Sequence, residues 1–247
     1  MSATATPSEA KSHSLFRWRS HEISRIEGFS DAVFAFAVTL LVVSLEVPET
    51  FTELWEKMHG FVAFALCFAA LFYVWYEQYV FFRRYAFKDN FTIWMNGALI
   101  FVVLTYVYPL KFLFGLLVRL FTTGHTTVHL HDGSTVPMIE LEQFPTLMIT
   151  YAFGYLAVSL IFVLLFHHAW RKREQLELNA VEELLTQSSI RSHMINIGVA
   201  VLSLAIVLLT SRSDFAGMIY MIIGPLQFLN GWSTGKRVER AQASLAN

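Results

Sequence analysis

The sequence predicts an all-α integral membrane protein with six transmembrane helices per subunit. Apolar residues make up 55% of the 247-residue chain and charged residues only 15%, whereas ordinary soluble domains carry about 25% charged residues. A soluble fold of this length has too little interior for so many apolar side chains, but lipid accepts them on the outside of a helix bundle. The number and orientation of the helices follow from two further observations, the spacing of the apolar stretches and the distribution of the basic residues.

Six apolar stretches each approach or exceed the roughly 20 residues that a helix needs to cross the hydrocarbon core of a bilayer. They lie at residues 29–47, 60–82, 91–118, 144–166, 194–211 and 215–232. Pro109 and Lys111 predict a kink in the third stretch or its exit from the bilayer, and Gly224-Pro225 predicts a kink in the sixth. The chain then divides into a polar tail over residues 1–22, a six-helix transmembrane domain over 23–233 and a second tail over 234–247.

The basic residues predict the orientation, because cytoplasmic loops of membrane proteins are enriched in Lys and Arg. With six alternating spans and a cytoplasmic N-terminus, all but four of the 18 basic residues lie on the cytoplasmic side, the exceptions being Lys57, Lys111, Arg119 and Arg212. The external loops are acidic instead. We therefore expect both termini to be cytoplasmic, and residues 1–20 are too polar for a cleaved signal peptide.

An amphipathic segment over residues 174–187 lies between the fourth and fifth stretches. Leu178, Val181, Leu184 and Leu185 recur there at helical spacing, which predicts a cytoplasmic connecting helix. Its apolar face is suited to packing on the bundle or to docking a partner protein.

The first span is the most informative part of the sequence. It begins Arg25-Ile26-Glu27-Gly28-Phe29-Ser30-Asp31 and continues into an apolar core. At about 100° per residue, one stripe of this helix carries Phe29, Ala32, Phe36, Leu40, Val43 and Val47. By spacing alone, such a stripe is typical of helix packing or lipid contact.

Asp31 lies well around the helix from this stripe and is expected to face neighbouring helices. An ionised side chain at the edge of the bilayer is costly unless it is paired or hydrated. One alternative is that Ser30 and Asp31 cap the start of the helix. Otherwise we expect a polar network that fixes the angle of the helix, with partners at the cytoplasmic starts of other spans: Trp94, Asn96, His193 and Asn196.

Glu77 is a second carboxylate close to the cytoplasmic edge, near the end of the second stretch. We expect it to extend to Arg83 or Arg84 at the interface, with membership of the Asp31 network as the alternative.

The pattern R-x-x-x-F-S-D, followed by an apolar core that contains T-L-L-V, resembles the first helix of the transmembrane protein 175 family. That family comprises lysosomal and prokaryotic potassium channels. The residues in register with its pattern are Arg25, Phe29, Ser30, Asp31, Thr39, Leu40 and Leu41. The rest of the chain is similar only in general plan, and its length resembles that of prokaryotic members with one six-helix unit.

The resemblance implies a potassium-selective channel in which four identical subunits surround one pore lined by the first helix, in a prokaryotic cell membrane. Carried over by position, the constriction is formed by Phe36, Leu40 and Val43, and Thr39 beside them offers a hydroxyl to the passing ion. Many members carry Ile or Leu where this chain has Phe36 and Val43, so the radius of the constriction is expected to differ. No T-V-G-Y-G filter sequence occurs, so selection is expected to depend on pore radius and dehydration cost.

No metalloprotease, nucleophile-elbow, phosphate-loop or cysteine-based pattern occurs in the sequence. We therefore expect no enzymatic activity and no cofactor, with K⁺ as the permeant ion and membrane lipids as neighbours. The net charge of −1 indicates no nucleic-acid partner. His125, His129 and His131 in the long external loop form a weak candidate for a metal site, since histidines can bind Zn²⁺ or Cu²⁺, but solvated loop histidines are more common.

Two alternative functions remain open from the sequence. A proton- or cation-coupled transporter would place an ionisable residue at the bilayer midplane beside broken helices, whereas Asp31 and Glu77 lie near the cytoplasmic edge. A non-conducting scaffold or an intramembrane enzyme is the second alternative. Flux measurements would distinguish them, because a channel follows the electrochemical gradient alone.

Overall fold

The computed structural model describes residues 15–20, 22–43, 49–51, 54–55, 58, 60–124, 127–129, 134–210 and 213–246. The helices in this part of the chain are α1 (Arg25–Val43), α3 (Phe61–Tyr85), α4 (Asn90–Thr123), α5 (Phe144–Arg171), α6 (Ala180–Thr210), α7 (Ser213–Met218) and α8 (Ile223–Ala246). The expected architecture of six long helices is confirmed. Four of the described helices, α3 to α6, are long and apolar enough to cross a membrane.

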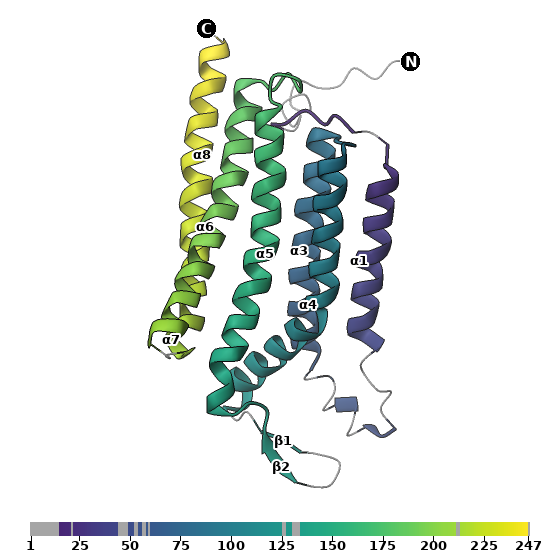
Figure 1. The fold of residues 1–247 in the computed structure, drawn as a ribbon, viewed down its shortest axis with the longest axis vertical. Coiled ribbons are helices and arrows are strands. Elements are labelled where there is room, and N and C mark those ends of the chain that lie inside the picture. Colours follow the sequence, from purple (N-terminus) through teal and green to yellow (C-terminus); the bar gives the residue numbers. More distant parts are fainter. Residues whose placement is uncertain are drawn as a thin grey trace.

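The long helices run roughly side by side, with α1 at one edge of the bundle and α8 at the other (Figure 1). Along this row α1 packs on α3 and α4, α4 packs on α5, α5 packs on α6, and α6 packs on α8. Because α1 has its neighbours on one side, much of its opposite face is left exposed within the subunit.

Two apolar clusters hold the bundle together. One lies beneath α1, where Phe34, Ala37 and Leu41 pack against Cys67 of α3 and Val107 of α4. The other is rich in aromatic rings and joins the end of α3 to α5, with Phe81, Phe82, Tyr85, Phe162 and Phe166 among its members. The first cluster fixes which face of α1 points inward, and the second fixes the end of the bundle where α3 ends and α6 begins.

The helix continues through one of the two prolines at which a kink was predicted, whereas it is interrupted just before the other. α4 continues as a helix through Pro109, and its lower part turns away from the bundle axis toward the base of α5 (Figure 1). The sixth stretch is interrupted before Pro225, by the 3-10 turn η3 (Ile219–Ile222) between α7 and α8. Pro225 then lies in the first turn of α8, where its missing N–H removes no helical hydrogen bond.

The prediction of a separate connecting helix over residues 174–187 is wrong. Residues 172–177 form turns, and α6 begins at Ala180 and continues for 31 residues without a break. Its start is fixed by reciprocal capping, since the Glu182 N–H donates to Asn179 Oδ1 at 2.9 Å and the Asn179 N–H donates to Glu182 Oε2 at 3.2 Å. At about 1.5 Å per residue α6 is about 46 Å long, so it extends well beyond a hydrocarbon core of about 30 Å.

A small hairpin of β1 (Thr127–His129) and β2 (Thr135–Pro137) adds two antiparallel strands to the expected helical fold. With the 3-10 turn η2 (Leu141–Gln143) it connects α4 to α5. At the other end of the bundle, residues 15–20 of the predicted N-terminal tail pack against the bundle, and α8 continues through the predicted boundary at residue 233 to Ala246.

Candidate functional site

α1 begins one turn before its apolar core. The Ser24 N–H donates to Glu27 Oε1 at 3.0 Å, and the Glu27 N–H donates to Ser24 Oγ at 3.3 Å. This capping box satisfies donors that the first turn of a helix leaves free. Ser30 and Asp31 therefore lie in the second turn, and the alternative that they cap the helix is wrong. Arg25, the first residue of α1, is exposed.

Ser30 connects α1 to two neighbouring helices. Its hydroxyl donates to the Ile26 carbonyl at 2.9 Å and accepts from Asn96 Nδ2 of α4 at 2.8 Å. Asn96 Oδ1 in turn accepts from Gln78 Nε2 of α3. Ser30, Asn96 and Gln78 are all buried. A buried polar network of this kind specifies one arrangement of its helices, because each unpaired member would incur a desolvation cost.

Asp31 faces α3, as expected for a residue turned toward a neighbouring helix, but its partner differs from the four expected ones. Its Oδ1 accepts a hydrogen bond from Trp75 Nε1 at 2.7 Å. Of the four expected partners, Asn96 reaches α1 through Ser30, whereas Trp94 is 75% exposed. The short distance and the charged acceptor make the Asp31–Trp75 contact a charge-assisted hydrogen bond.

The other two expected partners lie on α6 and are buried there. His193 Nε2 is 3.7 Å from Glu77 Oε2 of α3, and its ring stacks on Phe162 with centroids 4.8 Å apart. Asn196 Oδ1 accepts from Gln227 Nε2 of α8 at 2.8 Å. Glu77 therefore faces α6, and no ion pair of Glu77 with Arg83 or Arg84 is found among the described residues, so the sequence-based prediction for Glu77 is wrong. The reason is tertiary: α6 places an imidazole within reach of this carboxylate.

The outward face of α1 carries Phe29, Ala32, Ala35, Phe36 and Thr39, all of them exposed. Phe36 is 57% exposed, and the Thr39 hydroxyl donates to the Ala35 carbonyl at 2.8 Å. Three residues of the predicted stripe thus lie on this face together with Thr39.

The remaining two candidate constriction residues differ from Phe36. Leu40 is half-buried and packs partly against the cluster beneath α1. Val43 is the last residue of α1, and its side chain lies outside the described part of the structure. The exposed face of α1 thus includes Phe36 and Thr39, with Leu40 at its border.

Residues 15–20, which we call the N-terminal strap, cross the end of the bundle before α1. Phe16 is buried with its ring edge against Tyr85, at 5.5 Å between centroids. The Arg19 N–H donates to the Arg83 carbonyl at 2.9 Å. The strap therefore lies on the last turn of α3 before the chain enters α1.

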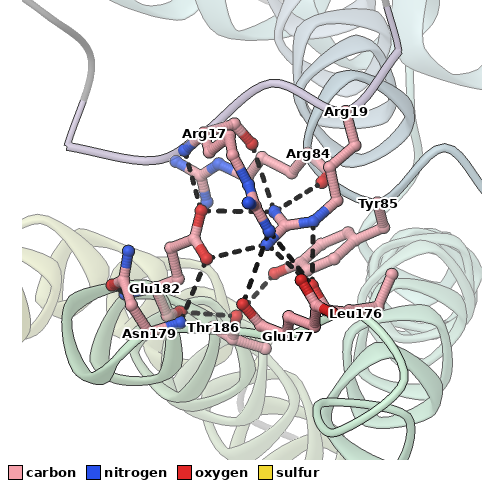
Figure 2. A network of polar contacts seen from close by, with 9 residues as sticks. All are labelled: Arg17, Arg19, Arg84, Tyr85, Leu176, Glu177, Asn179, Glu182 and Thr186. Carbon is pink, nitrogen blue, oxygen red and sulfur yellow. Dashed lines mark hydrogen bonds and ion pairs between the residues drawn. The ribbon is translucent and has the colours of Figure 1, made fainter.

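Figure 2 shows the polar contacts that fasten the strap. The Arg19 guanidinium donates to both oxygens of Glu182, at 2.8 and 3.2 Å, and to the Leu176 carbonyl at 2.9 and 3.1 Å. Glu182 is completely buried and also accepts from the Arg17 N–H at 2.8 Å. The paired carboxylate thus connects the chain segment before α1 to the start of α6.

Comparison with known proteins identifies the family. The family model described as endosomal/lysosomal potassium channel TMEM175 matches residues 25–107. A potassium channel of Marivirga tractuosa is 37% identical over 230 residues, which cover 91% of this chain and 93% of that relative. The chain belongs to the TMEM175 family. A potassium channel of Chamaesiphon minutus is 32% identical over 99 residues, which cover 36% of this chain and 47% of that protein.

Solved TMEM175 structures share the fold. The crystal structure of a variant of the potassium channel MtTMEM175, in complex with a nanobody–MBP fusion protein, matches with a TM-score of 0.77 and 35% identity, covering 91% of this chain and 98% of that chain. A lysosomal potassium-selective channel TMEM175 homologue from Chamaesiphon minutus matches with a TM-score of 0.53 and 21% identity, covering 87% of this chain and 99% of that chain. The second likeness concerns the fold alone.

The region matched by the TMEM175 family model includes both polar contacts of α1, Ser30–Asn96–Gln78 and Asp31–Trp75. Gln78, Trp75, Arg19 and Glu182 were not predicted from the sequence as members of this site. A weak signal for Glu182 existed, because Asn179 and Glu182 have capping-box spacing.

The candidate metal site in the external loop lies outside the described part of the chain. His125 and His131 are not among the described residues, and neither is the side chain of His129 in β1. Across the part of the chain that the structure covers, no group of three His, Cys, Asp or Glu side chains is placed to hold a metal ion.

Proposed function

We propose that the chain is a subunit of a homotetrameric potassium-selective channel whose pore is lined by four copies of α1. Membership of the TMEM175 family supports potassium conduction. The position of α1 at the edge of the subunit, with one face packed inward and the other exposed, supports its role at a shared axis.

The single observation that carries this proposal is the composition of the exposed α1 face. On that face the small residues Ala32, Ala35 and Thr39 lie beside the exposed rings of Phe29 and Phe36. Small residues let transmembrane helices approach closely. Ala32, Ala35 and Thr39 would therefore allow copies of α1 to approach one another, with Phe36 projecting from the same face.

We propose that Phe36, Leu40 and Val43 form the narrow part of the pore, with Thr39 beside them. Rings of apolar side chains exclude a fully hydrated ion, so conduction depends on ring radius and on the cost of removing water. Thr39 supplies a hydroxyl oxygen at the same level. The basic residues at the strap end of the bundle support a cytoplasmic location of both termini, and the bacterial relatives support a prokaryotic cell membrane.

Potassium flux and single-channel currents from purified protein in liposomes test this proposal. Leu40→Ala is expected to raise conductance and weaken the preference for K⁺ over Na⁺, because a shorter side chain widens the ring. Phe72→Ala removes a ring from the exposed face of α3 and is the matched control. If neither Leu40→Ala nor Phe36→Ala changed the currents, α1 would not line the ion pathway.

A proton-coupled transporter is the second candidate, favoured by the Glu77–His193 pair between α3 and α6, 3.7 Å apart. Ionisable residues within transmembrane helices often mark proton pathways. A channel passes K⁺ down its gradient without moving protons stoichiometrically. A transporter would be favoured if the luminal pH of the liposomes changed in fixed proportion to the potassium flux. Glu77→Gln would then abolish the pH change that accompanies the flux.

A further inference from the structure

A large apolar cavity lies inside the subunit, away from the exposed face of α1. Its volume is about 480 Å³, and residues of α3, α4, α5, α6 and the α7–η3 segment line it. Binding pockets for small molecules commonly measure about 300–1,000 Å³, so the cavity is large enough for a ligand. Phe162, His193, Leu117 and Met148 are among its lining residues.

The cavity wall suits hydrocarbon and does not suit an ion. None of its lining residues is Lys, Arg, Asp or Glu. Two of its tyrosine hydroxyls are engaged with backbone, since Tyr106 donates to the Thr150 carbonyl at 2.9 Å and Tyr151 donates to the Pro109 carbonyl. Water occupies buried sites where several polar partners surround it. The wall therefore offers no carboxylate or basic chain to a hydrated ion, although Ser159, His193 and Asn196 add polar atoms to a lining that is otherwise mostly apolar.

The cavity is open on one side rather than sealed, so whatever surrounds the subunit can enter it. Tyr73, which lines the cavity, is half exposed, so the cavity reaches the surface along α3. In a membrane, hydrocarbon chains surround that opening.

We propose that one acyl chain of a membrane phospholipid occupies this cavity. The acyl chain would lie between α3 and α4 on one side and α5, α6 and η3 on the other. The Tyr220 hydroxyl is buried in the cavity wall and donates no hydrogen bond to the described residues. Tyr220 lies on η3, at the end of the bundle away from the strap. Its hydroxyl donates to an ester carbonyl of the lipid, and the headgroup remains outside.

Photolabelling of the full-length channel in liposomes tests this proposal. The probe is phosphatidylcholine with a diazirine midway along one acyl chain, and peptide mass spectrometry locates the adducts. Adducts are expected on Leu113 and Val158 inside the cavity, in addition to exposed Phe153 on α5. Adducts confined to exposed residues overturn the proposal.

Filling the cavity provides the matched comparison. Val158→Trp is expected to reduce labelling of Leu113 at least fivefold without changing labelling of Phe153, whereas Leu160→Trp on the exposed face of α5 leaves both unchanged. Ala70→Leu is a milder filling variant in case Val158→Trp does not fold. Labelling of Leu113 that persists in a folded filling variant overturns the proposal.

Two further comparisons use diester and diether lipids, and dissociated subunits and the intact oligomer. Tyr220→Phe is expected to lower labelling by the diester lipid several-fold and to leave labelling by a diether lipid, which lacks the carbonyl, unchanged. A free fatty acid with the same diazirine that labels the cavity when the phospholipid does not would identify a different occupant. If dissociated subunits are labelled and the intact oligomer is not, a neighbouring subunit fills the cavity and the proposal fails.

Discussion

Both oxygens of the Glu182 carboxylate accept hydrogen bonds from the Arg19 guanidinium, at 2.8 and 3.2 Å. The two side chains are only 1% and 12% exposed, although 163 residues separate them in the chain. Arg19 belongs to the strap that precedes α1, and Glu182 to the first turn of α6. The approach of the chain to α1 is therefore set by a contact with a helix on the far side of the bundle.

Replacement of Glu182 by Gln is expected to lower the free energy of unfolding by about 3–5 kcal/mol, because a buried guanidinium loses its counter-charge. Thermal unfolding in detergent measures the loss. Arg173→Ala is the control, since Arg173 and Glu183 are 4.0 Å apart and both more than a third exposed, and its effect is expected to stay below about 1 kcal/mol. Equal losses in the two variants would contradict a special role for the strap contact.

The Asp31–Trp75 hydrogen bond is expected to hold the angle of α1 on α3. Asp31→Ala and Trp75→Phe each remove the bond and are expected to cost about 1.5–3 kcal/mol, the usual range for a hydrogen bond to a charged group. Assembly, measured by light scattering, should weaken more than K⁺ selectivity, measured by reversal potential. Normal tetramers with altered selectivity would show that Asp31 acts on the ion instead.

Asn96→Ala leaves Ser30 and Gln78 without their shared partner in a buried position. Each unsatisfied group costs about 1–3 kcal/mol, so the variant is expected to be among the least stable single substitutions in α4. Trp94→Ala, two residues earlier on the exposed surface of the same helix, is the matched control. Denaturation by sodium dodecyl sulfate followed by circular dichroism compares them, and comparable midpoints would argue against the network.

Asp89 predicts an acid-dependent loss of stability. Burial alone would raise the pKa of Asp89, but hydrogen bonds from Lys172, the Thr92 N–H and His168 outweigh it and hold the pKa well below its ordinary value. A carboxylate with a lowered pKa contributes its full stabilisation above the unfolded-state pKa, and the contribution is lost as the pH falls toward the folded-state pKa.

The difference in melting temperature between wild type and Asp89→Asn should therefore be constant near neutral pH and shrink in acid, below the ordinary pKa of aspartate. Asn at this position still caps α4, so the variant isolates the charge. A difference that grows as the pH falls would have the wrong sign for this mechanism.

Gly154→Ala tests the contact between α4 and α5 at the cavity wall. A methyl group at residue 154 would overlap the Tyr106 ring, which lies against the α5 backbone. Overpacking of this kind typically costs about 1–3 kcal/mol. Gly198→Ala in α6 meets no atom within 4 Å and is expected to be neutral or slightly stabilising. Shortening Tyr106 to Leu in the Gly154→Ala background should restore the melting temperature.

The first helix illustrates how far the sequence could predict the site. Helical periodicity correctly placed Phe29, Ala32 and Phe36 on one face and turned Asp31 away from it, because residue spacing within one helix fixes direction around its axis. It could not identify Trp75 as the partner of Asp31. Four polar residues at span ends were equally plausible, and only the packing of α1 on α3 distinguishes among them.

By itself, the sequence determined that the chain is a bundle of long apolar helices with its basic residues gathered at one side, because span length and composition are local properties. The tertiary structure decided which polar groups meet. Glu182 pairs with Arg19, and Glu77 lies 3.7 Å from His193, because segments far apart in the chain lie side by side. Burial makes the Glu182–Arg19 pairing specific, since an unpartnered charge inside the bundle would cost a large share of the net stability.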